Sequence, residues 1–514
     1  MIWSSWTDVW EWPGTCFRDD VMGASRTTQQ TCPQGLRAKG SATPLALLAL
    51  LGILHALVAF PNHALLRTYA LDLGLYTHSL WHYAHGIMHD SSLFLEAPAP
   101  MLADHFDLYL ILFSPLVYIT GTWTLVVVQW LSLLVGAWGV YKVLREVGLP
   151  QGRAMNGMAI LLLFFGVFGA SAYDYHSSVV AAMMLPWFIL NTIRNAPWRA
   201  ALVFLFMVMG KENMGFWLGP LSLLLAGSAM VPLTMRRTLM ILGSTGVVWS
   251  AVTVAWLMPW LAGAGTYAHF DYSLLGPGPL DAFTALWKKP LSLLSALFLD
   301  HMEVVDGSAI KLEFWVLMIL SGGWALIVRP RWGLMALPLV AQKMWNDDPV
   351  KWSVIAQYSV EFAPLIAITM PLVLHDVPLQ RKWTIALAVL VLVGCTIRFM
   401  DHTVAYQDRS RIRIYQAQHY TKPYDHRRVL ALMDALPAHA SISAQSPAVP
   451  HLALRDTLYQ FPLVRNARYI TLLPLESPYP LSRSDYDDRL RELHGSPEWE
   501  AIVNSEEVVL FKRR

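Results

Sequence analysis

The chain has 514 residues, of which 55% are hydrophobic and only 14% are charged, against roughly 25% charged residues in an average soluble domain. A formal net charge of +2 gives no electrostatic reason to expect nucleic acid as a partner. The charges are unevenly distributed, because 29 of the 114 residues in 401–514 are charged, against 45 of the 400 residues before them. The composition excludes a disordered chain and predicts a membrane-embedded part followed by a soluble part.

Eleven apolar stretches in residues 44–400 are long enough, or nearly so, to cross a bilayer, which takes roughly 20 helical residues. They lie at 44–60, 122–144, 154–171, 176–193, 199–212, 214–233, 238–262, 314–328, 332–344, 355–374 and 382–400. Segment 105–120 is nearly as apolar, so the count is open between eleven and twelve or thirteen. We expect this segment to lie in the outer interface. The pattern predicts an all-α polytopic membrane protein with about 11 transmembrane helices.

Basic residues in the short loops predict the orientation, because loops rich in lysine and arginine remain in the cytoplasm. Thirteen of these residues fall on one side of the predicted membrane and four on the other. We therefore expect a multi-pass protein of the cell inner membrane, in contact with the lipid bilayer. Its residues 1–43 would form a disordered cytoplasmic tail and residues 44–400 the helical domain. The long first loop, 61–121, and residues 401–514 would lie outside.

Residues 401–514 alternate between helix and strand patterns, which predicts a small soluble α/β domain. Segment 427–436 has a helical period and stops before Pro437, and segment 483–494 follows a serine cap. The segments ASISAQ, TLYQF and ARYITLL have the pattern of strands, and EAIV and VVLFKR flank NSEE as a hairpin would.

Polar residues gather in the loops that are predicted to lie outside. They are Asp72, Asp104 and His105 in the first loop, Asp174, His176, Lys211 and Glu212 in short turns, and Gln357 and Tyr358 in a later loop. An ionisable group at membrane depth costs about 2.5–3.5 kcal/mol, so it is normally functional or paired. We expect these turns to meet at one cavity open to the outside. The structural alternative is a set of loop acids, interfacial ion pairs and hydrogen-bonded histidines.

Five segments occur in the order seen in a large family of prokaryotic membrane proteins, domain of unknown function 2079, which the chain resembles from about residue 45 to its end. They are ALDLGLYTHSLWHYAHG, DHFDLYLILFSPLVYI, YDYHSSVVAAMMLPW, GKEN and QYSVEFAPL. The family's usual Phe-Asp-Leu-Gly is Leu71-Asp72-Leu73-Gly74 here. Its His-Phe-Ser-Pro is replaced by His105-Phe106-Asp107-Leu108.

That family in turn resembles the type C glycosyltransferases, which take sugars from polyprenyl-phosphate lipids on the outer face of the membrane. The resemblance implies a catalytic role for Asp72, the acid just after the first span. It also implies a polyprenyl-phosphate sugar as donor and a glycan, lipid or protein as acceptor. The carboxylate of Asp72 would either accept the proton of the acceptor hydroxyl or hold a divalent cation, Mg²⁺ or Mn²⁺, for which Asp72 and Asp104 are the candidate ligands. The residues implied for binding substrate or lipid phosphate are His105, Asp174, His176, Lys211, Glu212, Gln357 and Tyr358.

Two other classes of function remain open. A transporter for a lipid or small molecule would place charges near the bilayer midplane and show related halves, whereas the polar groups here cluster at one predicted surface. A non-catalytic assembly or binding protein would use the external domain to hold a partner.

Overall fold

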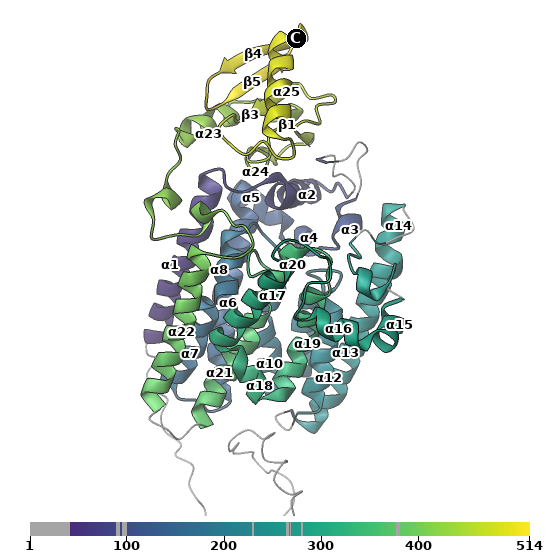
Figure 1. The fold of residues 1–514 in the computed structure, drawn as a ribbon, viewed down its shortest axis with the longest axis vertical. Coiled ribbons are helices and arrows are strands. Elements are labelled where there is room, and N and C mark those ends of the chain that lie inside the picture. Colours follow the sequence, from purple (N-terminus) through teal and green to yellow (C-terminus); the bar gives the residue numbers. More distant parts are fainter. Residues whose placement is uncertain are drawn as a thin grey trace, which may run out of the picture.

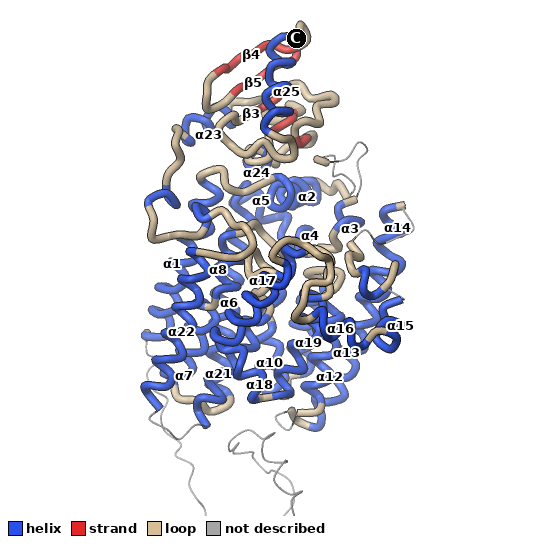
Figure 2. The backbone as a smooth tube through the Cα atoms, viewed as in Figure 1, coloured by secondary structure: helices blue, strands red, loops and turns tan. Residues whose placement is uncertain are grey.

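The computed structural model describes residues 42–88, 93–94, 100–228, 231–263, 267, 269–278, 281–376 and 381–514. The expected tail, 1–43, lies almost wholly outside these residues. Helices dominate the described chain, and a small sheet domain near the C-terminus caps one end of the helical bundle (Figures 1 and 2). The expectation of a helical membrane protein with a small C-terminal sheet domain is thereby confirmed.

Every predicted apolar stretch contains helix, but few of these helices are long and continuous. Five helical runs are long and apolar enough to cross a membrane: Thr43–Ala64, Tyr109–Glu146, Leu233–Ala262, Gly307–Val328 and Thr384–Asp401. Helices α7 (Gln151–Leu163) and α8 (Phe165–Ala172) form a sixth when counted together across a bend of 45°. Four apolar helical segments are shorter, at 10–17 residues.

The structure thus supports five or six spans in its described residues, where the sequence predicted eleven. The difference arises mainly because several predicted stretches form apolar helices of only 10–17 residues, a length that composition alone does not reveal. The predicted span 176–193 is divided at Met184 into α9 (Ser177–Met183) and α10 (Leu185–Ile193). Segment 105–120 is no separate span, because its short helices lead directly into α6 (Thr124–Glu146).

The other helices of the bundle are α1 (Thr43–Ala64), α11 (Pro197–Val208), α12 (Met214–Ala226), α13 (Leu233–Val252), α14 (Met258–Ala262), α17 (Gly307–Met318), α18 (Trp324–Val328), α19 (Pro330–Met344), α21 (Phe362–Asp376) and α22 (Arg381–Asp401). Short helices fill the connections: α2 (Leu75–Ala84), α3 (Met101–Asp104), α4 (Tyr109–Phe113), α5 (Val117–Thr120), α15 (Asp281–Lys288), α16 (Pro290–Ala296) and α20 (Pro349–Trp352). Of these, α2 and α5 lie beneath the sheet domain (Figure 1).

The sheet domain has five strands in the order β2-β1-β3-β5-β4. Strand β1 (Ile442–Ala444) pairs in parallel with β2 (Leu458–Gln460) and β3 (Tyr469–Leu472), whereas β5 (Val509–Arg513) is antiparallel to β3 and to β4 (Trp499–Asn504). Three helices accompany the sheet: α23 (His426–Asp434), α24 (Val449–Leu452) and α25 (Arg483–Gly495). Ser482 caps α25 by accepting a hydrogen bond from the Asp485 backbone N–H, as the sequence indicated.

The segment that enters the sheet domain is fastened to the helical bundle. Arg67 is buried and donates hydrogen bonds to the carbonyl oxygens of Ser410, Gln418, His419 and Thr421 at 2.5–3.1 Å. Side chains of α23, α24, β1 and β2 belong to the same hydrophobic core as the bundle. The rest of the sheet domain has a small core of its own around Phe461, Tyr486 and Phe511.

Candidate functional site

Asp72 lies in a π-helical turn, η2 (Ala70–Gly74), which follows the first long helix and precedes α2. The turn is held from below by Asp174, whose Oδ2 accepts from the Tyr69 N–H at 2.9 Å and the Leu73 N–H at 3.4 Å. Helix α24 of the sheet domain packs against the other side of the turn. A Cβ on Gly74 would lie only 2.7 Å from Val449 Cγ1, so the residue after Leu73 must be small.

The side chain of Asp72 faces His176, with Oδ1 at 3.4 Å from Nε2. His176 is fixed by its backbone N–H, which donates to Gln129 Oε1, and by a 3.0 Å contact of Nδ1 with the Asp174 carbonyl oxygen. With Nδ1–H donating to that carbonyl, Nε2 is the nitrogen that faces Asp72. Burial alone would raise the pKa of Asp72, but the adjacent His176 lowers it, so Asp72 is ionised at neutral pH.

Asp174 has its own charged partner, Arg411, which comes from the segment before the sheet domain. Arg411 Nη2 lies 2.9 Å from Asp174 Oδ1, and both side chains are buried. The guanidinium also lies 5.2 Å from the Tyr69 ring centroid and 5.1 Å from that of Tyr173. Both carboxylate oxygens of Asp174 are thus engaged by protein groups, which makes it a positioning residue for the turn that carries Asp72.

Glu212 anchors a second polar group at the same end of the bundle. It is 1% exposed, and its carboxylate accepts from the Phe106 N–H at 3.2 Å and the Tyr267 hydroxyl at 3.0 Å. Its Oε1 lies 3.7 Å from His105 Nδ1. Burial raises the pKa of Glu212, but the contact with His105 and the charge of Lys211 lower it below its usual value, so the buried carboxylate is ionised.

Asp104 and His269 complete this group. Asp104 Oδ1 lies 2.8 Å from His269 Nε2, and the rings of His269 and His105 stack with centroids 4.6 Å apart. One ligand atom from each of Asp104, His105 and His269 lies within 4.8 Å of the others. This donor set does not suit Mg²⁺, which prefers oxygen ligands in octahedral geometry. In the described part of the chain, Asp72 does not belong to such a group.

Tyr76, on α2, lies between the two groups. Its ring centroid is 6.2 Å from that of His176 and 6.3 Å from that of His105. Burial, followed by the charges of Asp72 and Asp107, raises the pKa of its hydroxyl, which is therefore a neutral hydrogen-bond donor. Tyr76 thus lies within ring-contact distance of one histidine from each group.

The other residues singled out in the sequence lie around this region. Lys211 is half-buried, has no ion-pair partner within the described part of the chain, and its charge adds to burial in lowering the pKa of His105. Gln357 is buried, and its Oε1 has no hydrogen-bond partner among the described residues. Burial, followed by the charges of Tyr173 and Asp72, raises the pKa of Tyr358.

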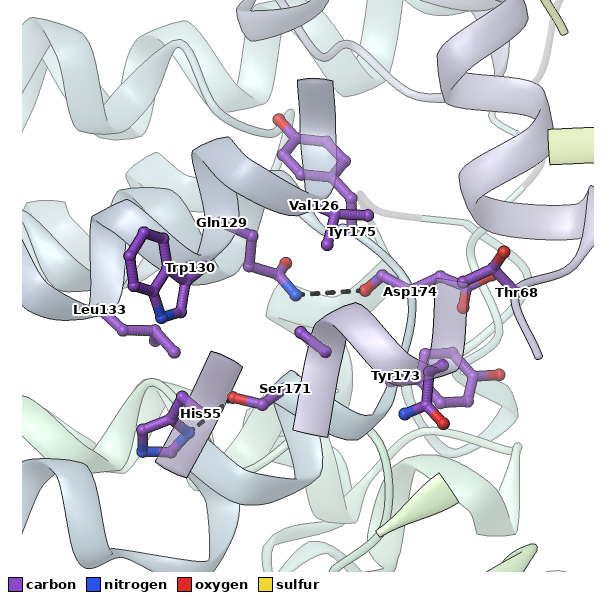
Figure 3. A pocket seen from close by; sticks show the side chains of 12 residues that line it. His55, Thr68, Val126, Gln129, Trp130, Leu133, Ser171, Tyr173, Asp174 and Tyr175 are labelled. Atoms are coloured by element: carbon purple, nitrogen blue, oxygen red, sulfur yellow. Dashed lines mark hydrogen bonds between the residues drawn. The ribbon is translucent and has the colours of Figure 1, made fainter. Parts of the chain in front are cut away.

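Two cavities lie in this part of the molecule, and of the residues singled out in the sequence only Asp174 lines one of them. The first lies beneath Asp174 and has a volume of about 20 Å³, room for one water molecule and far too little for a sugar. Figure 3 shows Gln129 pointing toward Asp174, and His55 toward Ser171, across it. The second is a cleft of about 670 Å³, the size of a small-molecule site. It lies between residues 120–123 and helices α23 and α24.

Sequence reasoning missed several residues that complete the site. Arg411 and the cleft-lining Arg427 and Arg455 lie in the domain that was read only for its helix and strand pattern. His269 and Tyr267 lie in a loop with no recognisable motif.

The fold and the site define a multi-pass helical membrane protein whose polar residues meet at the end of the bundle that carries a small sheet domain. A comparison with protein families matches residues 62–484 to the predicted membrane protein family DUF2079. The chain belongs to this family. None of the curated proteins searched matches the chain.

Proposed function

We propose that this protein is a glycosyltransferase that takes a sugar from a polyprenyl-phosphate-linked donor on the outer face of the inner membrane. The observation that carries the proposal is the contact between Asp72 and His176. An ionised carboxylate, 19% exposed, stands at the end of the bundle in a turn that other residues hold in place. A structural acid such as Asp174 is buried and has both carboxylate oxygens engaged by protein groups. Asp72 differs, because its side chain is partly exposed.

In the proposed reaction, the acceptor hydroxyl oxygen forms a bond to the anomeric carbon of the sugar. The bond between that carbon and the lipid phosphate oxygen breaks, and its electron pair stays on the phosphate. Asp72 accepts the hydroxyl proton, the work of a general base. His176 keeps Asp72 ionised before the reaction, and no step requires a metal ion.

Positive charge is needed where the lipid phosphate leaves, and Lys211 is the group best suited to supply it. Its ammonium is half-buried and unpaired among the described residues, so a phosphate would not have to displace a carboxylate from it. Oriented donors in a site that excludes water typically contribute about 2.7–4 kcal/mol each to the stabilisation of developing negative charge.

The cleft beneath the sheet domain is the proposed acceptor site. Helix α24 links it to the catalytic region, because α24 lines the cleft with His451 and Leu452 and packs against η2 through Val449. The arginines at its wall, Arg427 and Arg455, and the ring of Trp123 provide hydrogen-bond donors and a stacking surface. These are groups that bind sugar rings and anionic substituents.

The direct test uses purified protein in liposomes with a panel of polyprenyl-phosphate-linked sugars, and measures the polyprenyl phosphate released. Asp72→Asn should lower the rate by a factor of roughly 10² or more, the usual contribution of a general base, at unchanged abundance and melting temperature. Asp487→Asn makes the same chemical change on the exposed face of α25 and should leave the rate unchanged. Equal rates for Asp72→Asn and the wild type would contradict the assignment.

A further inference from the structure

We propose that Asp104, His105 and His269 bind one divalent ion of the Zn²⁺ class. The three residues come from segments far apart in the sequence. Asp104 ends α3, His105 follows it, and His269 lies in the loop after α14. Helices α3 and α14 pack against each other, which brings the two segments together (Figure 1).

The distances among the donor atoms suit a metal ion. Ligand atoms at about 2.0–2.1 Å around a tetrahedral ion lie roughly 3.4 Å from one another. Here Asp104 Oδ1 and His269 Nε2 are 2.8 Å apart, and all three donors fall within 4.8 Å. Binding therefore requires that side-chain adjustment bring separations of 2.8 Å to at most 4.8 Å to roughly 3.4 Å.

Glu212 provides the second observation that points to a ligand. Histidines that bind metals usually offer their other ring nitrogen to a carboxylate, which fixes the ring and increases its basicity. Glu212 Oε1 lies 3.7 Å from His105 Nδ1, a nitrogen that is buried and otherwise without a hydrogen-bond partner among the described residues. With Nδ1 turned to Glu212, Nε2 of His105 is the nitrogen available to the ion.

Glu212 is itself firmly oriented. The Phe106 N–H and the Tyr267 hydroxyl donate to its two oxygens. Tyr267 and the ligand His269 come from the same loop, so this loop supplies both a ligand and the group that orients the carboxylate behind another ligand. A surface ion pair between Asp104 and His269 alone would require neither of these contacts.

The chemical types of the three donor atoms indicate which ion would bind. Two imidazoles and one carboxylate suit Zn²⁺ and its transition-metal neighbours rather than Mg²⁺ or Ca²⁺, which take oxygen ligands. Three protein ligands leave a fourth position open to water or to an anionic oxygen. Asp104 and His269, at 46% and 34% exposed, leave that position accessible from outside the protein.

The test measures metal binding without donor or acceptor, so its result is independent of the transferase proposal. The full chain, purified in detergent through a tag that contains no histidines, is stripped with a chelator and reloaded with Zn²⁺. Metal content is measured by mass spectrometry, and the site is examined separately through the visible absorption of bound Co²⁺. We expect about one ion per chain, in agreement with a single three-ligand site.

Variants of the proposed ligands and of Glu212, the carboxylate behind His105, should bind Zn²⁺ more weakly than the wild type. His269→Ala and Asp104→Asn should lower the Zn²⁺ affinity at least tenfold, and Glu212→Gln should lower it by about 10–100-fold. Tyr267→Phe removes only the hydroxyl that orients Glu212. It tests the same contact if Glu212→Gln fails to fold. His439→Ala, at an exposed histidine of the sheet domain, is the matched control and should keep full affinity. A wild type that retains no Zn²⁺, or a His269→Ala variant with wild-type affinity, would overturn the proposal.

Discussion

Arg411 and Asp174 illustrate how a charged pair can serve a site without touching a substrate. The pair is buried, and Asp174 also accepts two backbone N–H groups of the turn that carries Asp72. Arg411 comes from the segment that leads to the sheet domain, so the position of Asp72 depends on the attachment of that domain. Asp72, by contrast, keeps a side chain that is 19% exposed, while its partner His176 is buried.

Removing one member of this buried pair should lower the folding stability far more than removing one member of an exposed pair. Arg411→Leu leaves the Asp174 carboxylate buried without its counter-charge, and should cost about 3–5 kcal/mol of folding free energy. Arg194→Leu is the matched control, because Arg194 and Glu146 form a 2.6 Å pair that is largely exposed, and it should cost less than about 1 kcal/mol. Thermal melting in detergent compares them, and equal losses would contradict the role given to Arg411.

The sequence predicted candidate site residues where polar residues lie between apolar helices. Asp72, His176, Lys211 and Glu212 were found because they occupy turns between such helices. The sequence could not show that Asp174 would differ from Asp72, because the difference depends on Arg411, more than two hundred residues later. His269 was missed for a similar reason, since its partners Asp104 and His105 lie in another loop.

At the scale of elements, helices α12 and α13 show why glycines recur in the apolar stretches. Gly215 and Gly219 on α12 face Gly243 and Gly246 on α13, and the two backbones approach closely. A Cβ on Gly215 would lie 1.9 Å from the Gly246 carbonyl oxygen, which cannot move without distorting α13. Small residues of this kind let helices pack in a membrane, where no hydrophobic force drives helices together.

The variant Gly215→Ala should therefore destabilise the protein by about 1–3 kcal/mol, the usual cost of overpacking. Gly394→Ala on α22 is the control, because a Cβ there meets nothing within 4 Å. Alanine is the better helix former by about 1 kcal/mol, so this control should be neutral or stabilising. A melting temperature that falls equally in both variants would show that close packing is not the cause.

Helix length is the main reason that the number of spans was overestimated, because four apolar helical segments reach only 10–17 residues. Every predicted apolar stretch contains helix, but the sequence reading did not find the short helices α15 and α16 or the breaks at Phe164 and Met184. In the sheet domain, the turn and capping signals around Ser482 and the final hairpin were local, and these elements were predicted well. The parallel pairing of β1 with β2 and β3 is non-local and left no such signal.

The distribution of basic residues over the whole molecule predicts that the sheet domain lies on the outer face of the inner membrane. Helices α7 and α18 lie at the end of the bundle opposite the sheet domain (Figure 1), near the basic loops. Reporter fusions after residues 150, 196, 236 and 330 should be active in the cytoplasm, and a fusion at residue 514 should be active outside. Cytoplasmic activity of the last fusion would contradict the outward orientation of the site.

The most direct test of the central claim is a structure determined experimentally with polyprenyl phosphate bound in lipid nanodiscs. We expect density for the phosphate beside Lys211, within reach of the Asp72 carboxylate, at the end of the bundle that carries the sheet domain. The lipid chain should run from there along the apolar surface of the helices. Phosphate density at the opposite end of the bundle, or at a site remote from Asp72 and His176, would contradict the account.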